Sequence, residues 1–129
     1  DKNRLRENKS ARERKLNNPI YKLKCNLRRN LSMMLSRDGY TKKSKTIDIL
    51  GCSFEVFKQN LESKFEDWMN WANYGKYNGT KCYGWDIDHI IPISLAKNEE
   101  DILKLNHYTN LQPLCSKINR DIKKNNILF

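Results

Sequence analysis

The stretch WDIDHIIPIS, residues 85–94, decides the fold of the last third of the chain. Apolar and polar residues alternate through it and just before it, a period of two that is typical of a strand with one buried face. The alternation predicts a β-strand over residues 83–91, closed by Pro92. Asp88 and His89, two residues that can carry chemistry, fall near the end of this strand.

The residues that follow predict an excursion, a second strand and a final helix. Asn98, with an acidic turn after it, marks the start of a short helix. Residues 108–111 can form a second short strand, which Pro113 interrupts. Residues 115–125 have the apolar spacing of a helix.

The upstream sequence predicts two amphipathic helices and a loop. Asn18 caps a helix that has Pro19 at its first position and ends near Gly39. Ser53 caps a second helix, whose stripe of large residues predicts core packing rather than stacking on bases. Asparagine and glycine make residues 70–84 a loop. The stripes comprise Ile20, Leu23, Leu27, Leu31 and Met34 in the first helix and Phe54, Phe57, Leu61, Phe65 and Trp68 in the second.

The positive charge of the chain is concentrated in its first third. Residues 1–45 hold 15 of the 25 Lys and Arg but 4 of the 15 Asp and Glu, a net charge of +11. Residues 46–129 carry a net charge of −1. This asymmetry favours a polyanionic partner for the N-terminal segment, although a helix kept soluble by its charge would show the same pattern.

Composition excludes several classes of protein. No apolar run approaches the length of a membrane span, and the first residues lack the apolar stretch of a secretory signal, so we expect an intracellular, non-secreted protein. With 129 residues and high charge, we expect one small domain with an extension. The four cysteines are isolated, which predicts reduced thiols and no structural zinc.

Four residues of the last third have the types that phosphodiester hydrolysis needs. Such a reaction requires a base that activates water and a cation that stabilises charge on the phosphate. His89 can be the base, Asp88 can anchor a hard cation, and Asn119 can supply a second oxygen ligand, with water completing a magnesium shell. Each residue also has a structural explanation, as a strand-end pair, as a turn residue at Asn110 or as a polar helix residue. Their order and spacing after the strand favour the catalytic interpretation.

The segments WDIDHIIPIS (85–94), HYTNLQPLC (107–115) and INRDIKKN (118–125) resemble the DH…N…N form of the HNH nucleases. More narrowly, they resemble small HNH proteins of phage and large-virus genomes. The resemblance extends more loosely to PIYKLKCNLRRNL (19–31) and ILGCSFEVFKQNLE (49–62). It implies a ββα-metal fold, one divalent cation, and cleavage that leaves a 5′-phosphate and a 3′-hydroxyl.

The resemblance also implies a role for each matching residue. Asp88 and Asn119 would be metal ligands and His89 the general base, while Asn110 would tie the loop between the strands and help to orient the histidine. Basic residues after the third motif would touch backbone phosphates, namely Arg120, Lys123 and Lys124. His107 is interpreted as structural or supporting.

Two features depart from the family pattern. Ile118 stands where many members have the second cysteine of a zinc-binding pair, so packing must hold this fold together. In a regular strand Asp88 and His89 also point to opposite faces. For both to reach one phosphate, the backbone would have to leave the regular pleat around residues 88–90.

The sequence therefore predicts an α+β protein with a C-terminal ββα-metal finger preceded by mainly helical, basic segments. We expect a basic arm over residues 1–45, a helical segment over 46–81 and a catalytic domain over 82–129. The expected function is a DNA endonuclease, monomeric or weakly dimeric, that uses Mg²⁺ or Mn²⁺ in the cytoplasm of a bacterial or virus-infected cell. Alternatives are a catalytically silent DNA-binding or packaging accessory and an RNA-directed nuclease. Further DNA contacts are expected from Arg12, Arg14, Lys22, Arg28 and Arg29.

Overall fold

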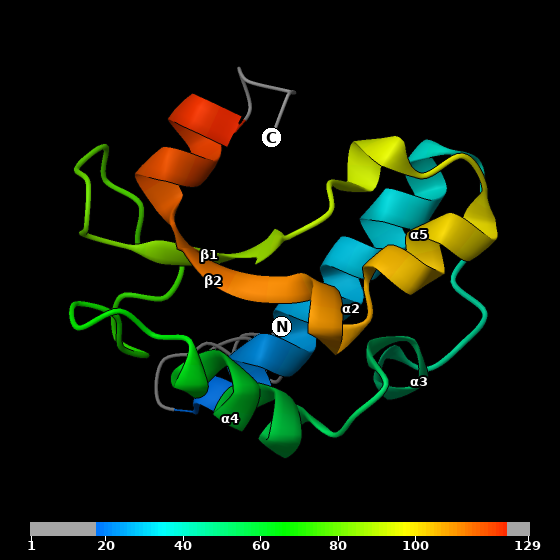
Figure 1. Cartoon of the computed structure of the whole chain (residues 1–129). Helices are drawn as coiled ribbons and strands as arrows, with labels where there is room; N and C mark the ends of the chain where they lie inside the picture. The colour runs from blue at the N-terminus through cyan, green and yellow to red at the C-terminus, as the bar shows by residue number, and fades with distance from the viewer. Residues whose placement is uncertain (1–17, 124–129) are drawn as a thin grey trace, which may run out of the picture. The chain divides into compact units, whose positions relative to one another are not determined.

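The chain has an α+β fold in which helices accompany one two-stranded antiparallel sheet within the described residues (Figure 1). The computed structural model describes residues 18–123, with only the backbone of residues 121–123. The chain divides into two compact units, residues 1–58 and 59–129. The functional division into three segments stays a prediction.

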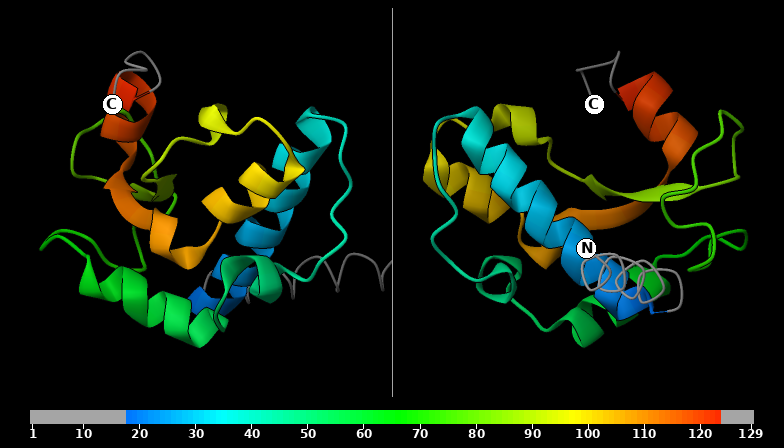
Figure 2. Two further views of the ribbon diagram at one scale, coloured as in Figure 1. Left: turned by 45° about the vertical axis from the view of Figure 1, so that its right-hand side comes forward. Right: turned by 180° about the vertical axis from the view of Figure 1, so that it is seen from behind.

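Helix α2 (Pro19–Arg37) is the main element of the N-terminal unit and runs without interruption (Figure 2). The side chain of Asn18 accepts a hydrogen bond from the Tyr21 amide at 3.2 Å, which confirms the predicted cap. The buried stripe consists of Leu23, Leu27, Leu31 and Leu35. It ends on Leu35 rather than on the expected Met34, which is half-buried. No helix within residues 18–123 combines the length and apolar character needed to cross a membrane.

Two shorter helices follow, and the sequence predicted one of them. Helix α3 (Thr46–Leu50) was not expected; it packs against α2 and ends at Gly51, whose φ of 84° suits glycine. Helix α4 (Phe54–Ser63) begins as predicted, because the Ser53 hydroxyl accepts a hydrogen bond from the Val56 amide. We expected the stripe of large residues in this helix to continue to Trp68, but the helix ends at Ser63.

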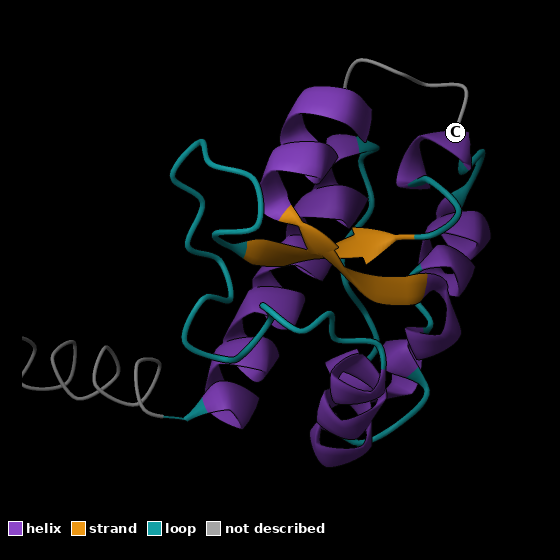
Figure 3. Ribbon diagram, turned by 60° about the vertical axis from the view of Figure 1, so that its left-hand side comes forward, coloured by secondary structure: helices purple, strands orange, loops and turns teal. Residues whose placement is uncertain are grey.

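Strands β1 (Trp85–His89) and β2 (Leu111–Cys115) form the sheet of the C-terminal unit (Figure 3). Strand β1 is shorter than the predicted 83–91. The prediction for the second strand was wrong, because residues 108–110 form the 3₁₀ turn η2 (Tyr108–Asn110) and β2 begins after it.

Pro113 lies within β2, where it was expected to interrupt a strand. It pairs with Ile87. Hydrogen bonds at both ends of the sheet, from the Ser116 amide to Gly84 O and from the Ile90 amide to Asn110 O, set the alternation of the ladder. In that alternation the pair of Ile87 and Pro113 is not hydrogen-bonded, so proline's missing N–H removes no bond between the strands.

Aromatic side chains around Trp85 form the core beside the sheet. Trp85 is fully buried, and its indole N–H donates to the Asn70 carbonyl at 2.7 Å. Ring centroids of Phe65, Trp71 and Tyr74 lie 5.0, 5.3 and 4.5 Å from that of Trp85. The predicted loop over residues 70–84 thus packs on β1 through its aromatic residues.

The connection between the strands and the segment after β2 complete the unit. The connection contains the 3₁₀ turn η1 (Ile93–Leu95) and helix α5 (Glu99–Leu105), which has Asn98 as its cap as predicted. After β2 the chain forms η3 (Ile118–Lys123), which has the wider turns of a π-helix. The expected order of strand, excursion, strand and helix is therefore confirmed, although the final helix is not a regular α-helix.

Gly84→Ala is expected to lower the free energy of unfolding by about 1–3 kcal/mol. A Cβ at this position would lie 2.7 Å from the backbone C and O of Lys76, so the loop would have to move away from the start of β1. Chemical denaturation measures the change. Tyr83→Ala, at the exposed neighbouring position, is the control and should change stability by less than about 0.5 kcal/mol. Equal stability of the two variants would contradict this close approach.

Candidate active site at the end of strand β1

Asp88 and His89 are the last two residues of β1, and they lie on opposite faces of the sheet. Asp88 pairs with Gln112 and His89 pairs with Leu111. The pairing stays regular beyond His89, since the Ile90 amide still donates to Asn110 O at 2.8 Å. The departure from the pleat was expected around residues 88–90, and the structure has it at the end of that range, as a bend at Ile90 and Ile91.

Asp88 is a buried carboxylate held by an amide from the neighbouring strand. Asp88 is 7% exposed, and Gln112 Nε2 donates a hydrogen bond to its Oδ2 at 3.0 Å. A buried charge is costly unless it is hydrogen-bonded or paired, and this bond meets part of that requirement. Because the nitrogen of Gln112 faces Asp88, its amide oxygen remains as a second oxygen donor nearby.

His89 is held by Asn106, a buried residue at the end of α5. His89 Nε2 lies 2.8 Å from Asn106 Oδ1, while Asn106 Nδ2 donates to the Ile102 carbonyl at 2.7 Å. Since a carbonyl can only accept, the amide nitrogen must face Ile102 and the amide oxygen must face the histidine. His89 Nε2 is therefore the donor, and the neutral ring carries its lone pair on Nδ1.

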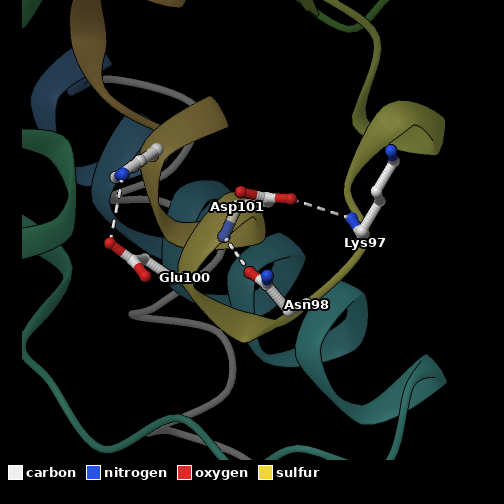
Figure 4. Close-up of polar contacts among 5 residues, drawn as sticks. Lys97, Asn98, Glu100 and Asp101 are labelled. Carbon is white, nitrogen blue, oxygen red and sulfur yellow. Dashed lines mark hydrogen bonds and ion pairs between the residues drawn. The ribbon is translucent and has the colours of Figure 1, made fainter.

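Helix α5, which carries Asn106 at its end, is fixed at its start by a network of side-chain bonds (Figure 4). The Asn98 side chain accepts from the Asp101 amide at 2.9 Å, and the Asp101 carboxylate accepts from the Lys97 amide at 3.0 Å. Glu100 pairs with Lys104 one turn on, at 3.1 Å. These acidic residues therefore cap the helix and complement its dipole.

Asn110 ties the loop that follows β1, which is the role that the resemblance implied for it. Its Oδ1 accepts from the Ile91 amide at 2.8 Å, and its Nδ2 donates to the carbonyls of Ile91 and Leu105 at 3.1 and 2.8 Å. These bonds hold the end of β1 beside the end of α5. The side chain in contact with His89 is nevertheless Asn106, so any effect of Asn110 on the histidine passes through the backbone.

Asn119 lies in η3, at the other end of the sheet from Asp88. It is half-buried, and η3 leaves the sheet where Trp85 pairs with Cys115 (Figure 1). Asp88 is three residues farther along β1, roughly 10 Å at the rise of a strand.

Arg120 connects η3 to the face of β1 that also carries Asp88. Its Nε lies 3.9 Å from Asp86 Oδ2, and its guanidinium carbon lies 4.5 Å from the ring centroid of Tyr77. More than half of the Arg120 side chain is exposed, so the ion pair contributes little to stability. Asp86, on the same face as Asp88, thus has an arginine beside it.

The other residues predicted to bind DNA lie in α2 or outside the described part of the chain. Arg28 and Arg29 are exposed on α2, and Lys22 is half-buried there. Lys123 belongs to η3, but its side chain is outside the described residues. Arg12, Arg14 and Lys124 also lie outside the described residues.

The four cysteines are free thiols, and they differ in exposure. Cys25, Cys52 and Cys82 are partly or fully exposed, whereas Cys115 is buried. Burial raises the pKa of the Cys115 thiol, but hydrogen bonds from the amides of Cys82, Ile118 and Lys117 and the charge of Lys81 outweigh it and lower the pKa. Backbone amides thus donate hydrogen bonds to this buried sulfur.

His107 has a structural position, as the sequence interpretation favoured. It caps η2, where its Nδ1 lies 2.8 Å from the Thr109 hydroxyl and accepts weakly from the Thr109 amide at 3.4 Å. Sequence reasoning did not identify Asn106 or Gln112. Their contacts depend on the strand register and on the end of α5, and a lone Asn or Gln gives no local signal of either.

The chain is similar to uncharacterized proteins of Acanthamoeba polyphaga mimivirus. It is 33% identical to uncharacterized protein L426 over 110 residues, which cover 84% of this chain and 44% of that protein. It is 28% identical to uncharacterized protein L246 over 137 residues, which cover 98% of this chain and 56% of that protein. The chain thus spans about half the length of the curated relatives it matches. No protein-family model and no solved structure matches it.

The bond from His89 to Asn106 predicts the tautomer of the histidine. Nitrogen-15 NMR of the imidazole ring, at a pH where the ring is neutral, should show a protonated Nε2 and an unprotonated Nδ1. Asn106→Leu removes the acceptor and should move the ring toward a mixture of tautomers. A ring protonated on Nδ1 in the unaltered protein would contradict the assignment.

Proposed function

We propose that the chain is a magnesium-dependent HNH endonuclease that hydrolyses DNA phosphodiester bonds and leaves a 5′-phosphate and a 3′-hydroxyl. The observation that carries the proposal is the end of β1, where a buried carboxylate and a histidine are adjacent in sequence and each is held by an amide from another element. Hydrolysis by a positioned base and a cation needs such fixed groups.

In this proposal His89 takes the proton from the attacking water. Its Nε2 donates to Asn106, so the lone pair of the neutral ring lies on Nδ1 and can accept that proton. Asn106 acts as a positioning residue, because it sets the tautomer and the ring orientation. Asn110 supports it by holding the end of β1 against the end of α5.

The residues around Asp88 fit a hard divalent cation. A carboxylate and amide oxygens suit Mg²⁺ or Mn²⁺, whereas zinc sites use thiolate and imidazole. Among the described side chains no three His, Cys, Asp or Glu gather as a metal site, so a cation here would keep several waters, as magnesium does. Asp88 would hold it, with Gln112 as a nearby oxygen donor. Asn119, the second ligand that the family resemblance implies, belongs to η3 at the other end of the sheet and would have to approach Asp88 when the cation binds. When bound, the cation would stabilise charge on the phosphate and on the leaving oxygen.

The ββα-metal fold belongs to the same proposal. Two antiparallel strands followed by the helical segment η3 have the order of such a finger. The relatives come from a large virus, the kind of genome in which the small HNH proteins that this chain resembles are common.

DNA binding is proposed to depend on the basic first third of the chain. Residues 1–45 carry a net charge of +11, and affinity for a duplex follows the number of phosphates that cationic side chains neutralise. Arg12, Arg14, Lys22, Arg28 and Arg29 are the proposed contacts there, with Arg120, Lys123 and Lys124 after the third motif. A protein with one site would nick as a monomer, and a dimer would be needed to cut both strands together.

His89→Ala should reduce magnesium-dependent nicking of supercoiled plasmid by about a hundredfold to ten-thousandfold, the usual contribution of a general base. DNA binding should stay nearly unchanged, because His89 is assigned a proton transfer and no phosphate contact. His107→Ala is the matched control and should cut at close to the unaltered rate, since His107 caps a turn. Thermal unfolding of each variant checks the fold, and His89→Gln replaces His89→Ala if the latter does not fold.

Asp88→Ala should also lose nicking, through weaker cation binding. Raising the concentration of Mg²⁺ or Mn²⁺ should therefore restore part of its activity but none of the activity of His89→Ala. If folded His89 variants nick DNA at the rate of the unaltered protein, His89 is not the general base. If the unaltered protein binds DNA but shows no metal-dependent nicking, the chain is a silent DNA-binding accessory, and faster cleavage of structured RNA than of duplex DNA would identify an RNA-directed nuclease.

A further inference from the structure

The N-terminal unit contains a cavity of about 290 Å³ that is lined by four cationic side chains. Lys24 and Arg28 come from α2, and Lys42 and Lys45 come from the segment that joins α2 to α3. These residues are separated by up to 21 positions in the sequence. The packing of α3 against α2 brings the two pairs to one cavity.

The cationic side chains of this cavity have no acidic partner among the residues that line it. None of the lining residues is acidic, and within residues 18–123 none of the four cations makes an ion pair. Lys24 and Arg28 are also four residues apart on one helix face, a spacing at which like charges destabilise a helix. An anion in the cavity would relieve this repulsion.

The rest of the lining is apolar apart from one hydroxyl. Thr46, which is buried, contributes the hydroxyl, and Ile47 and Phe54 contribute apolar surface, including an aromatic ring. A bare anion would use only the cationic side of such a cavity. A ligand that carries a phosphate and a flat apolar group would use both sides.

We propose that this cavity binds one nucleotide, with its phosphate among Lys24, Arg28, Lys42 and Lys45 and its base against Phe54 and Ile47. A volume of about 290 Å³ is at the lower end of small-molecule sites, which suits one nucleotide. Bases in a duplex are stacked on both faces, so the ligand is a free nucleotide or an unstacked nucleotide of a single strand. The site shares no residue with Asp88 and His89 and does not depend on nuclease activity.

Paired double variants of the full chain test the proposal. Arg28→Gln with Lys42→Gln removes two charges from the cavity. Arg37→Gln with Lys43→Gln is the control, because it removes the same two residue types from exposed positions outside the lining. The probes for calorimetry are adenosine 5′-monophosphate, adenosine, inorganic phosphate and a short single-stranded oligodeoxyadenylate.

The unaltered chain should bind adenosine 5′-monophosphate more tightly than adenosine or inorganic phosphate. The cavity variant should bind it at least about tenfold more weakly, since charge-assisted hydrogen bonds are lost, and the control should bind it as the unaltered chain does. If the cavity variant differs from the control variant only in its affinity for the oligonucleotide, the ligand is a nucleotide within a strand. NMR of the unaltered chain should show the largest shifts at residues 42–47 and Phe54, a result that does not depend on any variant.

Three results would overturn the proposal. Equal weakening by the cavity and control variants would mean that net charge alone attracts the probes. If inorganic phosphate binds as tightly as the nucleotide, Phe54 and Ile47 do not contribute to binding. Binding that neither variant changes would place the ligand elsewhere. Because two repelling charges are removed, the cavity variant should unfold at a temperature no lower than the control, which keeps the comparison valid.

Discussion

The antiparallel register of β1 and β2 is the constraint on which the candidate site depends. Side chains alternate along a strand, so a slip of one residue would exchange the faces of Asp88 and His89 and separate each from its partner. Gly84 at one end and Asn110 at the other hold the register through backbone bonds to Ser116 and Ile90. Asn110 adds side-chain bonds to Ile91, which fix the point where the strand gives way to the bend. The positions of both candidate catalytic residues follow from these contacts at the two ends of the sheet.

The sequence predicted the elements that local chemistry determines. Asn18, Ser53 and Asn98 were identified as helix caps, and each makes the expected hydrogen bond to an amide three residues on. The alternation around residue 87 likewise located β1. A cap and a period of two are properties of a few neighbouring residues, so they can be found without knowledge of the fold.

Features that depend on distant residues were not predicted. Pro113 argued against a strand, yet the ladder places it where no hydrogen bond between the strands is needed. Phe65 continued a helical stripe, but it leaves the helix to pack on Trp85, twenty residues away. Asn106 and Gln112 gain their importance only from the register and from the end of α5. In the candidate site, the sequence therefore predicted the residues proposed to react and Asn110, but not Asn106 and Gln112, whose side chains contact them.

Paramagnetic broadening by Mn²⁺ measures whether a divalent cation binds beside Asp88, as the proposed mechanism requires. Mn²⁺ is added to the ¹⁵N-labelled full chain without nucleic acid, and the loss of each amide signal is followed. If Asp88 holds the cation, the strongest broadening is expected at Asp88 and Gln112, with weaker effects at residues 99–101, where partly or fully exposed carboxylates lie in the first turn of α5. Strongest broadening at residues 99–101, with the signals of β1 unchanged, would contradict it.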